Sequence, residues 1–373
     1  MSAFAGDPRS SRNSSTALER LGPGVPVALL MEGNIDDDIG KLGVSMLRYA
    51  RSEIIAVIDH AHAGKQIGDL LPGVIPRGER LKVPVVASVE EAARRGAEVL
   101  VLAITPLGGK LPEAWREVMC RALDLGMSLV NPLHVHFADD PELSSRVKPG
   151  RWIWDVRVEP PGACTAEGLA RHLDMPRILL VGTDMAVGKM TAGLELARAL
   201  EELGRRPAFV ATGQVGICLT GDGVAIDAVR VDYAAGAVES AVLRISEGAD
   251  MVIVEGQGAL THPSATANLA LLRGTLPTHL MLVHRAGQVY PRENPWVRIP
   301  PRSRLIRLYE DLSSCEGAYP RPETFAVALN TARLSEDEAR ASMAEEAEET
   351  GLPVSDPVRF DPKILARALL DRI

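Results

Sequence analysis

The chain has 373 residues, of which 46% are apolar and 24% charged, as in an ordinary soluble globular protein, and this length favours two domains. Its formal net charge of −8 argues against general nucleic-acid binding, which needs a basic face, and no apolar run is long enough to cross a membrane. The four cysteines show no CxxC spacing, so we expect reduced thiols in a cytoplasmic protein and no disulfide framework.

The first half of the chain alternates short apolar runs with helical patterns. Residues 1–24 are polar and are expected to form a flexible arm. We expect strands at 25–31, 53–59, 83–88, 97–104 and 127–136, and helices at 41–50, 89–97 and 113–126. This βαβ alternation predicts an open parallel sheet in a first domain at 25–150. The polar, proline-broken stretch 141–176 is expected to connect it to the second domain, either without regular structure or with a few strands of its own.

A second α/β domain is expected at 151–373. Its strands are predicted at 177–182, 207–214, 251–258, 279–285 and 325–331, with a long helix at 189–204. Each of these strands ends in polar residues or glycine. Ligands bind beyond the carboxyl ends of parallel strands, so these tips are expected to converge on one site. The segment 291–304 is rich in proline and arginine and is expected to be a loop over that edge.

The stretch GTDMAVGKMT, from Gly182 to Thr191, lies between a predicted buried strand and a helix. Glycines let the backbone turn tightly with its N–H groups aimed inward, and a helix N-terminus favours negative charge. Lys189 is placed to bridge two phosphates. The stretch therefore predicts a phosphate-binding loop for a nucleotide or a nucleotide-derived cofactor. The alternative is a glycine-rich turn with a solvated lysine.

This loop departs from the usual pattern in two ways. Five residues separate Gly182 from Gly188 where four are standard, and this spacing resembles the loop of dethiobiotin synthetases. Met190 stands where a hydroxyl would ligate Mg²⁺, with Thr191 one place later. Either Thr191 substitutes or metal binding is weak. The residues expected to bind the cofactor are Gly182, Thr183, Asp184, Gly188, Lys189, Met190, Thr191 and Gln214.

The catalytic candidates follow the strand expected at 251–258. Glu255 stands at its tip, where a carboxylate positions a metal ion or its bound water, or accepts a proton from an amine. The alternative for Glu255 is an acid satisfied at a helix N-terminus. His262, on the next loop, is a candidate acid or base at neutral pH, and a solvated loop histidine is the alternative.

Other polar residues at the same edge are expected to bind substrate. An arginine fork suits a carboxylate, so Arg285, with Arg298 or Arg302, is a candidate for substrate carboxylates; an exposed surface arginine is the alternative. Asp232 either holds a substrate ammonium or caps a helix. The expected substrate-binding residues are Asp232, Gly256, Gln257, His284 and Arg285.

Two histidine pairs, His60/His62 and His134/His136, invite a metal interpretation because alternate residues of a strand share a face. No third ligand is evident nearby. We expect no metal site, and interpret these as ordinary strand-end histidines.

Several motifs together resemble one family, the two-domain P-loop family that contains the D-glutamate N-acetyltransferases. In the second half they are GTDMAVGKMT, ATGQVG, IDAVRVDYAAGAVE, VEGQGALTHP, VHRAGQ, IPPRSRLIRLYE and LNT. In the first half they are LGVSMLRYA, VIDHAHAGK, ITPLGGKLP and HFADDPEL. The resemblance spans about Val25 to Asp356.

The resemblance implies a Rossmann-like N-terminal domain and a P-loop C-terminal domain similar to dethiobiotin synthetase. The implied reaction is acetyl transfer from acetyl-CoA to the amine of an acidic amino acid, D-glutamate, by a homodimer. CoA carries phosphates that a phosphate loop could anchor without hydrolysis, which accommodates Met190. One alternative is an ATP- and Mg²⁺-dependent ligase or kinase, with Mg²⁺ on Thr191 and Glu255. Another is a nucleotide-binding regulatory module.

Overall fold

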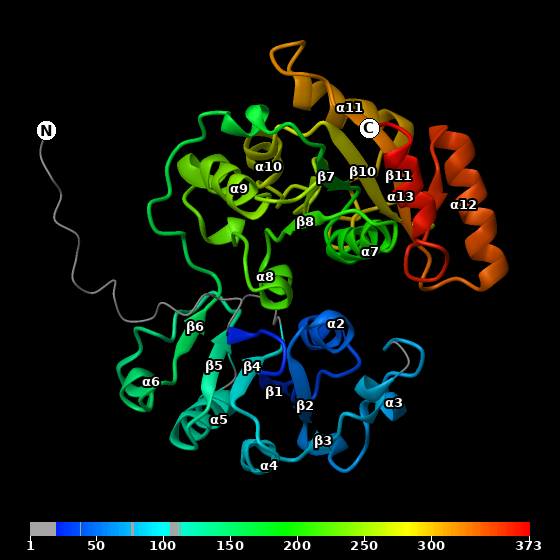
Figure 1. The fold of residues 1–373 in the computed structure, drawn as a ribbon. Helices are drawn as coiled ribbons and strands as arrows, with labels where there is room; N and C mark the ends of the chain where they lie inside the picture. The colour runs from blue at the N-terminus through cyan, green and yellow to red at the C-terminus, as the bar shows by residue number, and fades with distance from the viewer. Residues whose placement is uncertain (1–19, 38, 76–77, 105–110, 112) are drawn as a thin grey trace, which may run out of the picture. The chain divides into compact units, whose positions relative to one another are not determined.

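The computed structural model describes residues 20–37, 39–75, 78–104, 111 and 113–373. Two compact units are formed by the described parts of Met1–Arg157 with Cys218–Asp222, and of Val158–Ile217 with Gly223–Ile373. Each contains a parallel sheet of six described strands (Figure 1). Residues 1–19 of the expected arm lie outside the described residues.

The sheet of the first unit has the strand order β3-β2-β1-β4-β5-β6. Its strands are β1 (Pro26–Leu30), β2 (Glu53–Ile58), β3 (Val85–Val86), β4 (Val99–Leu102), β5 (Ser128–Asn131) and β6 (Ile153–Asp155). The connecting helices are α2 (Lys41–Tyr49), η1 (His60–His62), α3 (Ile67–Leu70), η2 (Glu79–Lys82), α4 (Val89–Arg94), α5 (Glu113–Asp124) and α6 (Pro141–Ser145). The order reverses at β1, as in a Rossmann-like sheet.

The sheet of the second unit has the order β12-β11-β10-β7-β9-β8. Its strands are β7 (Arg177–Gly182), β8 (Pro207–Val210), β9 (Met251–Val254), β10 (His279–Arg285), β11 (Glu323–Asn330) and β12 (Val354–Ser355). Its helices are η4 (Leu169–His172), α7 (Lys189–Glu202), α8 (Gln214–Thr220), η5 (Ile226–Ala228), α9 (Val231–Ile245), α10 (Asn268–Thr275), α11 (Arg302–Ser314), α12 (Glu336–Thr350) and α13 (Lys363–Leu370). The last three residues of α8, Cys218 to Thr220, belong to the first unit.

Both faces of this second sheet are covered, which explains why its strands read as continuous apolar runs. Leu179 and Val181 of β7 pack on one face against residues of α9, α10 and α11. Ile178 and Leu180 pack on the other face against α7 and α13. The doubly wound α/β architecture expected from the sequence is confirmed. Among the described residues, no helix has the length and apolar character needed to span a bilayer.

Several predicted boundaries are wrong. The strand expected over 127–136 ends at Asn131, because Pro132 has no N–H for the ladder and the Asn131 side chain accepts a hydrogen bond from Leu133 N. The loop expected over 291–304 ends at Pro301, after which α11 begins. The stretch 141–176, expected as a connection with or without strands of its own, contains β6, which pairs with β5 in the first sheet.

Helices α9 and α10 approach each other closely at a glycine. A Cβ on Gly274 of α10 would lie 2.4 Å from the Ala235 carbonyl oxygen and 2.6 Å from Val238 Cβ, both on α9. Only a residue without a side chain allows this spacing.

We therefore expect Gly274→Ala to lower the free energy of unfolding by about 1–3 kcal/mol, because the added methyl group must push the two helices apart. Urea denaturation followed by circular dichroism measures the loss. The matched control is Leu269→Gln, at a position of the same helix that is 53% exposed. Equal stability of Gly274→Ala and the wild type would show that this close approach does not constrain the fold.

Candidate functional site

The phosphate loop joins β7 to α7 as the sequence predicts. Two residues in it adopt left-handed backbone conformations, Ala186 with φ of 53° and Gly188 with φ of 112°. Glycine accepts this conformation without strain, whereas alanine rarely does. Such alternation turns successive backbone N–H groups toward one point and forms a concavity suited to anions.

Lys189 lies buried beneath this loop. Its Nζ donates to the backbone oxygen of Asp184 at 2.8 Å. Desolvation lowers the pKa of Lys189 to about 8, against the opposing effect of the Asp184 and Glu255 carboxylates. Two glycines make room for the side chain: a Cβ on Gly182 would lie 2.9 Å from Nζ, and a Cβ on Gly256 would lie 3.0 Å from Cδ. The loop thus encloses a lysine whose ammonium group can pair with an anion.

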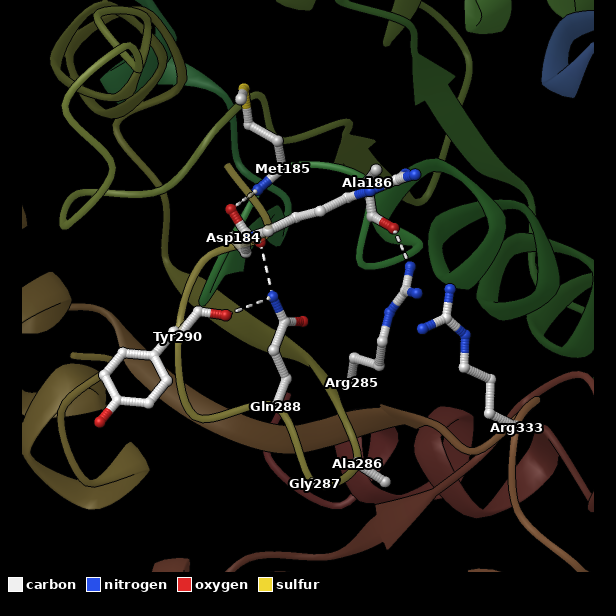
Figure 2. A pocket seen from close by; sticks show the side chains of 10 residues that line it. Asp184, Met185, Ala186, Arg285, Ala286, Gly287, Gln288, Tyr290 and Arg333 are labelled. Carbon is white, nitrogen blue, oxygen red and sulfur yellow. Dashed lines mark hydrogen bonds between the residues drawn. The ribbon is translucent and has the colours of Figure 1, made fainter. Parts of the chain in front are cut away.

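Asp184 ties the phosphate loop to the segment that follows β10 (Figure 2). Its carboxylate accepts from Met185 N at 2.7 Å, from Gln288 Nε2 at 2.6 Å and from Arg292 N at 2.9 Å. The Asp184 side chain thus holds the loop and the following segment together, and its part in cofactor binding stays a prediction.

Glu255 is buried directly after β9. Its Oε2 accepts from Thr212 N at 3.0 Å and Gly213 N at 3.3 Å. Burial raises the pKa of Glu255 to about 7, and the two backbone donors and Lys189 oppose this rise. A carboxyl with this pKa exchanges protons at neutral pH, as a general base must.

The backbone around Glu255 leaves no space for larger residues. A Cβ on Gly216 would lie 2.6 Å from Glu255 Oε2, and a Cβ on Gly213 would lie 2.4 Å from Gln257 Nε2. The strand predicted at 207–214 ends at Val210, since Thr212 and Gly213 donate to Glu255 rather than to the ladder. Gln214 is therefore the first residue of α8 and not a strand tip.

His262 is buried rather than solvated. Its Nδ1 accepts from Ser264 N at 3.1 Å. Nε2 lies 3.1 Å from Asn294 Nδ2 and 3.9 Å from Asp184 Oδ1. Polar groups of the chain therefore face both ring nitrogens, and the part of His262 in catalysis stays a prediction.

His284 is also buried, and its Nδ1 lies 2.9 Å from Thr183 Oγ1. Burial, reinforced by the positive charge of Arg302, lowers the pKa of His284 to about 4. The ring is neutral at pH 7 and positions Thr183 at the start of the loop.

The remaining predicted residues differ in their surroundings. Arg285 donates through Nη2 to Ala186 O at 2.7 Å. Arg302 pairs with Glu346 at 2.9 Å and also with Glu349, so carboxylates of this chain already occupy it. Asp232 lies exposed in the first turn of α9, after its start, and its contact with a substrate stays a prediction. Met190 and Thr191 are half-buried in the first turn of α7, and their part in cofactor binding stays a prediction.

Sequence reasoning did not single out Tyr309, which links three parts of the site. Its hydroxyl donates to Gly182 O at 2.9 Å and accepts from Leu260 N at 3.1 Å. Burial raises the pKa of Tyr309 to about 12, so it stays a neutral donor. An isolated tyrosine in an amphipathic helix gives no signal beyond its apolar spacing.

His60 and His62 do not lie on a strand and so do not share a strand face, as the sequence had suggested. They form the 3₁₀ helix η1 after β2 has ended. Among the described residues, ligand atoms of Glu32, Asp59 and His60 lie within 4.8 Å of one another. Asp59 accepts from Ala61 N at 3.0 Å and from the His62 ring at 3.0 Å, and the His60 ring meets Glu32. These hydrogen bonds account for the cluster as a cap of η1. His136, of the second pair, bonds through Nε2 to Arg157 O at 2.9 Å.

These features define a two-domain α/β protein with a Rossmann-like first domain and a P-loop in the second. The chain belongs to the DUF1611 family. The Rossmann-like domain of unknown function DUF1611_N matches residues 60–159, and the P-loop domain of unknown function DUF1611_C matches residues 164–366.

Similar proteins have been named. The chain is 34% identical over 284 residues to a D-glutamate N-acetyltransferase of Tritonibacter scottomollicae, covering 76% of this chain and 84% of the relative. It is 33% identical over 274 residues to a D-glutamate N-acetyltransferase of a Pseudoalteromonas species, covering 73% and 81%. A crystal structure of a DUF1611 family protein from Anabaena variabilis matches with a TM-score of 0.89 and 46% identity, covering 94% of this chain and 100% of that one. The family resemblance in the sequence is confirmed.

The raised pKa of Glu255 predicts a pH-dependent stability difference. Below pH 4.5 the carboxyl is neutral in both folded and unfolded chains. Between pH 4.5 and about 7 the folded state binds more protons, so stability falls as pH rises through this window. A glutamine in its place does not titrate.

Glu255→Gln should therefore match the wild type near pH 4.5 and exceed it by about 3 kcal/mol above pH 7, at roughly 1.4 kcal/mol for each unit of pKa shift. Unfolding in urea at pH 5, 6, 7 and 8 measures the difference, with the exposed Glu247→Gln as control. A difference that stays constant from pH 5 to pH 8 would contradict the raised pKa.

Proposed function

We propose that the protein is an N-acetyltransferase that moves the acetyl group of acetyl-CoA to the amine of an acidic amino acid, D-glutamate. The observation that carries the proposal is Glu255, a buried carboxyl with a pKa of about 7 beside the lysine of a phosphate loop. The names of two relatives at about one-third identity support the reaction class.

The residues of the loop fit the phosphates of CoA. The concavity formed by Ala186 and Gly188, with Lys189 beneath it, offers backbone donors and one ammonium group. Met190 stands at the position where ATP-hydrolysing loops place a hydroxyl for Mg²⁺. A cofactor that is anchored and not cleaved at its phosphates needs no such hydroxyl.

Glu255 supplies the proton transfer. Only a neutral amine attacks the thioester carbonyl, so the ammonium proton of the amino acid passes to the Glu255 carboxylate. The new bond joins the amine nitrogen to the acetyl carbon, the bond from that carbon to sulfur breaks, and the proton balance is completed on the CoA thiol. Backbone N–H groups at Gly256 and Gln257 are candidates to stabilise the negative charge that develops on the carbonyl oxygen.

Purified protein with acetyl-CoA and D-glutamate is expected to release free thiol, measured with a thiol reagent, together with N-acetylglutamate, measured by mass spectrometry. Glu255→Gln should lower kcat/KM by about 10²–10⁴-fold, the usual contribution of a general base. Glu247→Gln is the control. In the wild type, kcat/KM should rise as pH increases through about 7, because Glu255 must be deprotonated to act.

The strongest competing function is an ATP-dependent ligase or kinase, favoured by the loop itself and by a carboxylate at the tip of the neighbouring strand. It predicts Mg²⁺-dependent ADP release stimulated by a small acid, with no thiol release from acetyl-CoA. A regulatory module predicts nucleotide binding without turnover. The absence of thiol release with L- and D-glutamate and aspartate would exclude our proposal. A homodimer and a cytoplasmic location remain proposals.

A further inference from the structure

A pocket of about 260 Å³ opens beside the phosphate loop (Figure 2). One wall is the loop stretch 184–186. The other walls are the turn after β10 and the residues that follow β11. It is separate from the buried Glu255 and His262, neither of which lines it.

The charge of this pocket suits an anion. Arg285, Arg292 and Arg333 line it, and Asp184 is its one acidic residue. The Asp184 carboxylate is turned into its three hydrogen bonds and is only 2% exposed. Figure 2 shows the Arg285 and Arg333 side chains rising toward the backbone of Ala186. Within the described part of the chain, Arg333 forms neither an ion pair nor a hydrogen bond, and its side chain is exposed.

The strand order divides the site into two sides. The phosphate loop follows β7, which lies between β10 and β9 in the sheet. Arg285 ends β10 and Arg333 follows β11, whereas Glu255 follows β9. The arginines and the proposed base therefore lie on opposite sides of the loop.

The separation of β9 and β11 indicates whether the amino acid or CoA reaches the arginines. Three strand spacings separate β9 from β11, or about 14 Å at roughly 4.8 Å each. A glutamate measures roughly 6 Å from end to end, at about 1.5 Å per bond. The gap between the two strands therefore favours a longer reactant, such as CoA, over a single amino acid as the ligand of Arg333.

We propose that Arg333, with Arg285 and Arg292, forms a phosphomonoester subsite for the 3′-phosphate on the adenosine of CoA. The inference rests on the proposed use of acetyl-CoA. With the pyrophosphate on the loop and the thioester on the side of Glu255, the adenosine end extends toward β10 and β11. Arg285, expected from the sequence to bind a substrate carboxylate, is reassigned to the cofactor. The subsite would select CoA over nucleotides that lack this phosphate.

Isothermal titration calorimetry on the full-length chain tests the proposal with CoA and 3′-dephospho-CoA as probes. Wild-type protein is expected to bind CoA about 10- to 100-fold more tightly than 3′-dephospho-CoA, as charge-assisted hydrogen bonds to a phosphate would give. Arg333→Gln should weaken CoA binding to the level of 3′-dephospho-CoA and leave the affinity for 3′-dephospho-CoA unchanged. Arg307→Gln, which removes the same charge from an exposed position of α11, should retain the discrimination.

Each other outcome overturns the proposal in a distinct way. Equal binding of both probes by the wild type would show that the pocket does not recognise the 3′-phosphate. In that case, thiol release from acetyl-CoA would still support the acetyltransferase proposal. Equal weakening of both probes by Arg333→Gln would indicate a general electrostatic effect. If Arg333→Gln raises the KM for the amino acid and leaves the CoA affinity unchanged, the arginines bind the amino-acid acceptor and not the cofactor. Binding of ATP with Mg²⁺ and of neither probe would overturn the proposed function itself.

Discussion

The ammonium group of Lys189 is buried beneath its own loop. The residues around it must replace its lost hydration and leave room for its side chain. A charge removed from water is costly unless polar groups replace the water. Here the backbone oxygen of Asp184 accepts directly, and the carboxylates of Asp184 and Glu255 act at longer range. Gly182 and Gly256 must lack side chains for the lysine to fit. The same burial that lowers the pKa of Lys189 leaves the group able to gain by meeting a phosphate.

Tyr309, on helix α11, connects the surroundings of the loop to a helix far along the chain. It fixes the carbonyl of Gly182, at the start of the loop, and the amide of Leu260, beyond β9. The phosphate loop and the Glu255 strand are therefore held in register by a neutral side chain that does not titrate near pH 7.

The sequence predicts those parts of the site that depend on local pattern. The buried run RILLV, followed by two glycines and a lysine, is sufficient to place the loop, and an acid after the run MVIV is sufficient to place Glu255. The sequence does not predict that Gln214 starts a helix. The strand before it ends early because the backbone amides of Thr212 and Gly213 donate hydrogen bonds to the Glu255 carboxylate. Nor does the sequence predict the burial of His262 or its contacts with Ser264 N and Asn294. Arg333 lies three residues beyond a strand and gains meaning only from the strand order.

The three hydrogen bonds accepted by Asp184 have a thermodynamic consequence for any ligand. Residues 286–301 form no regular helix or strand, and ordering such a segment costs conformational entropy. Because Asp184 already fixes Gln288 and the amide of Arg292, much of that entropy is lost when the chain folds and not when a ligand arrives. The wall of the pocket is preorganised, and a ligand's contacts there contribute to its affinity with little opposing cost.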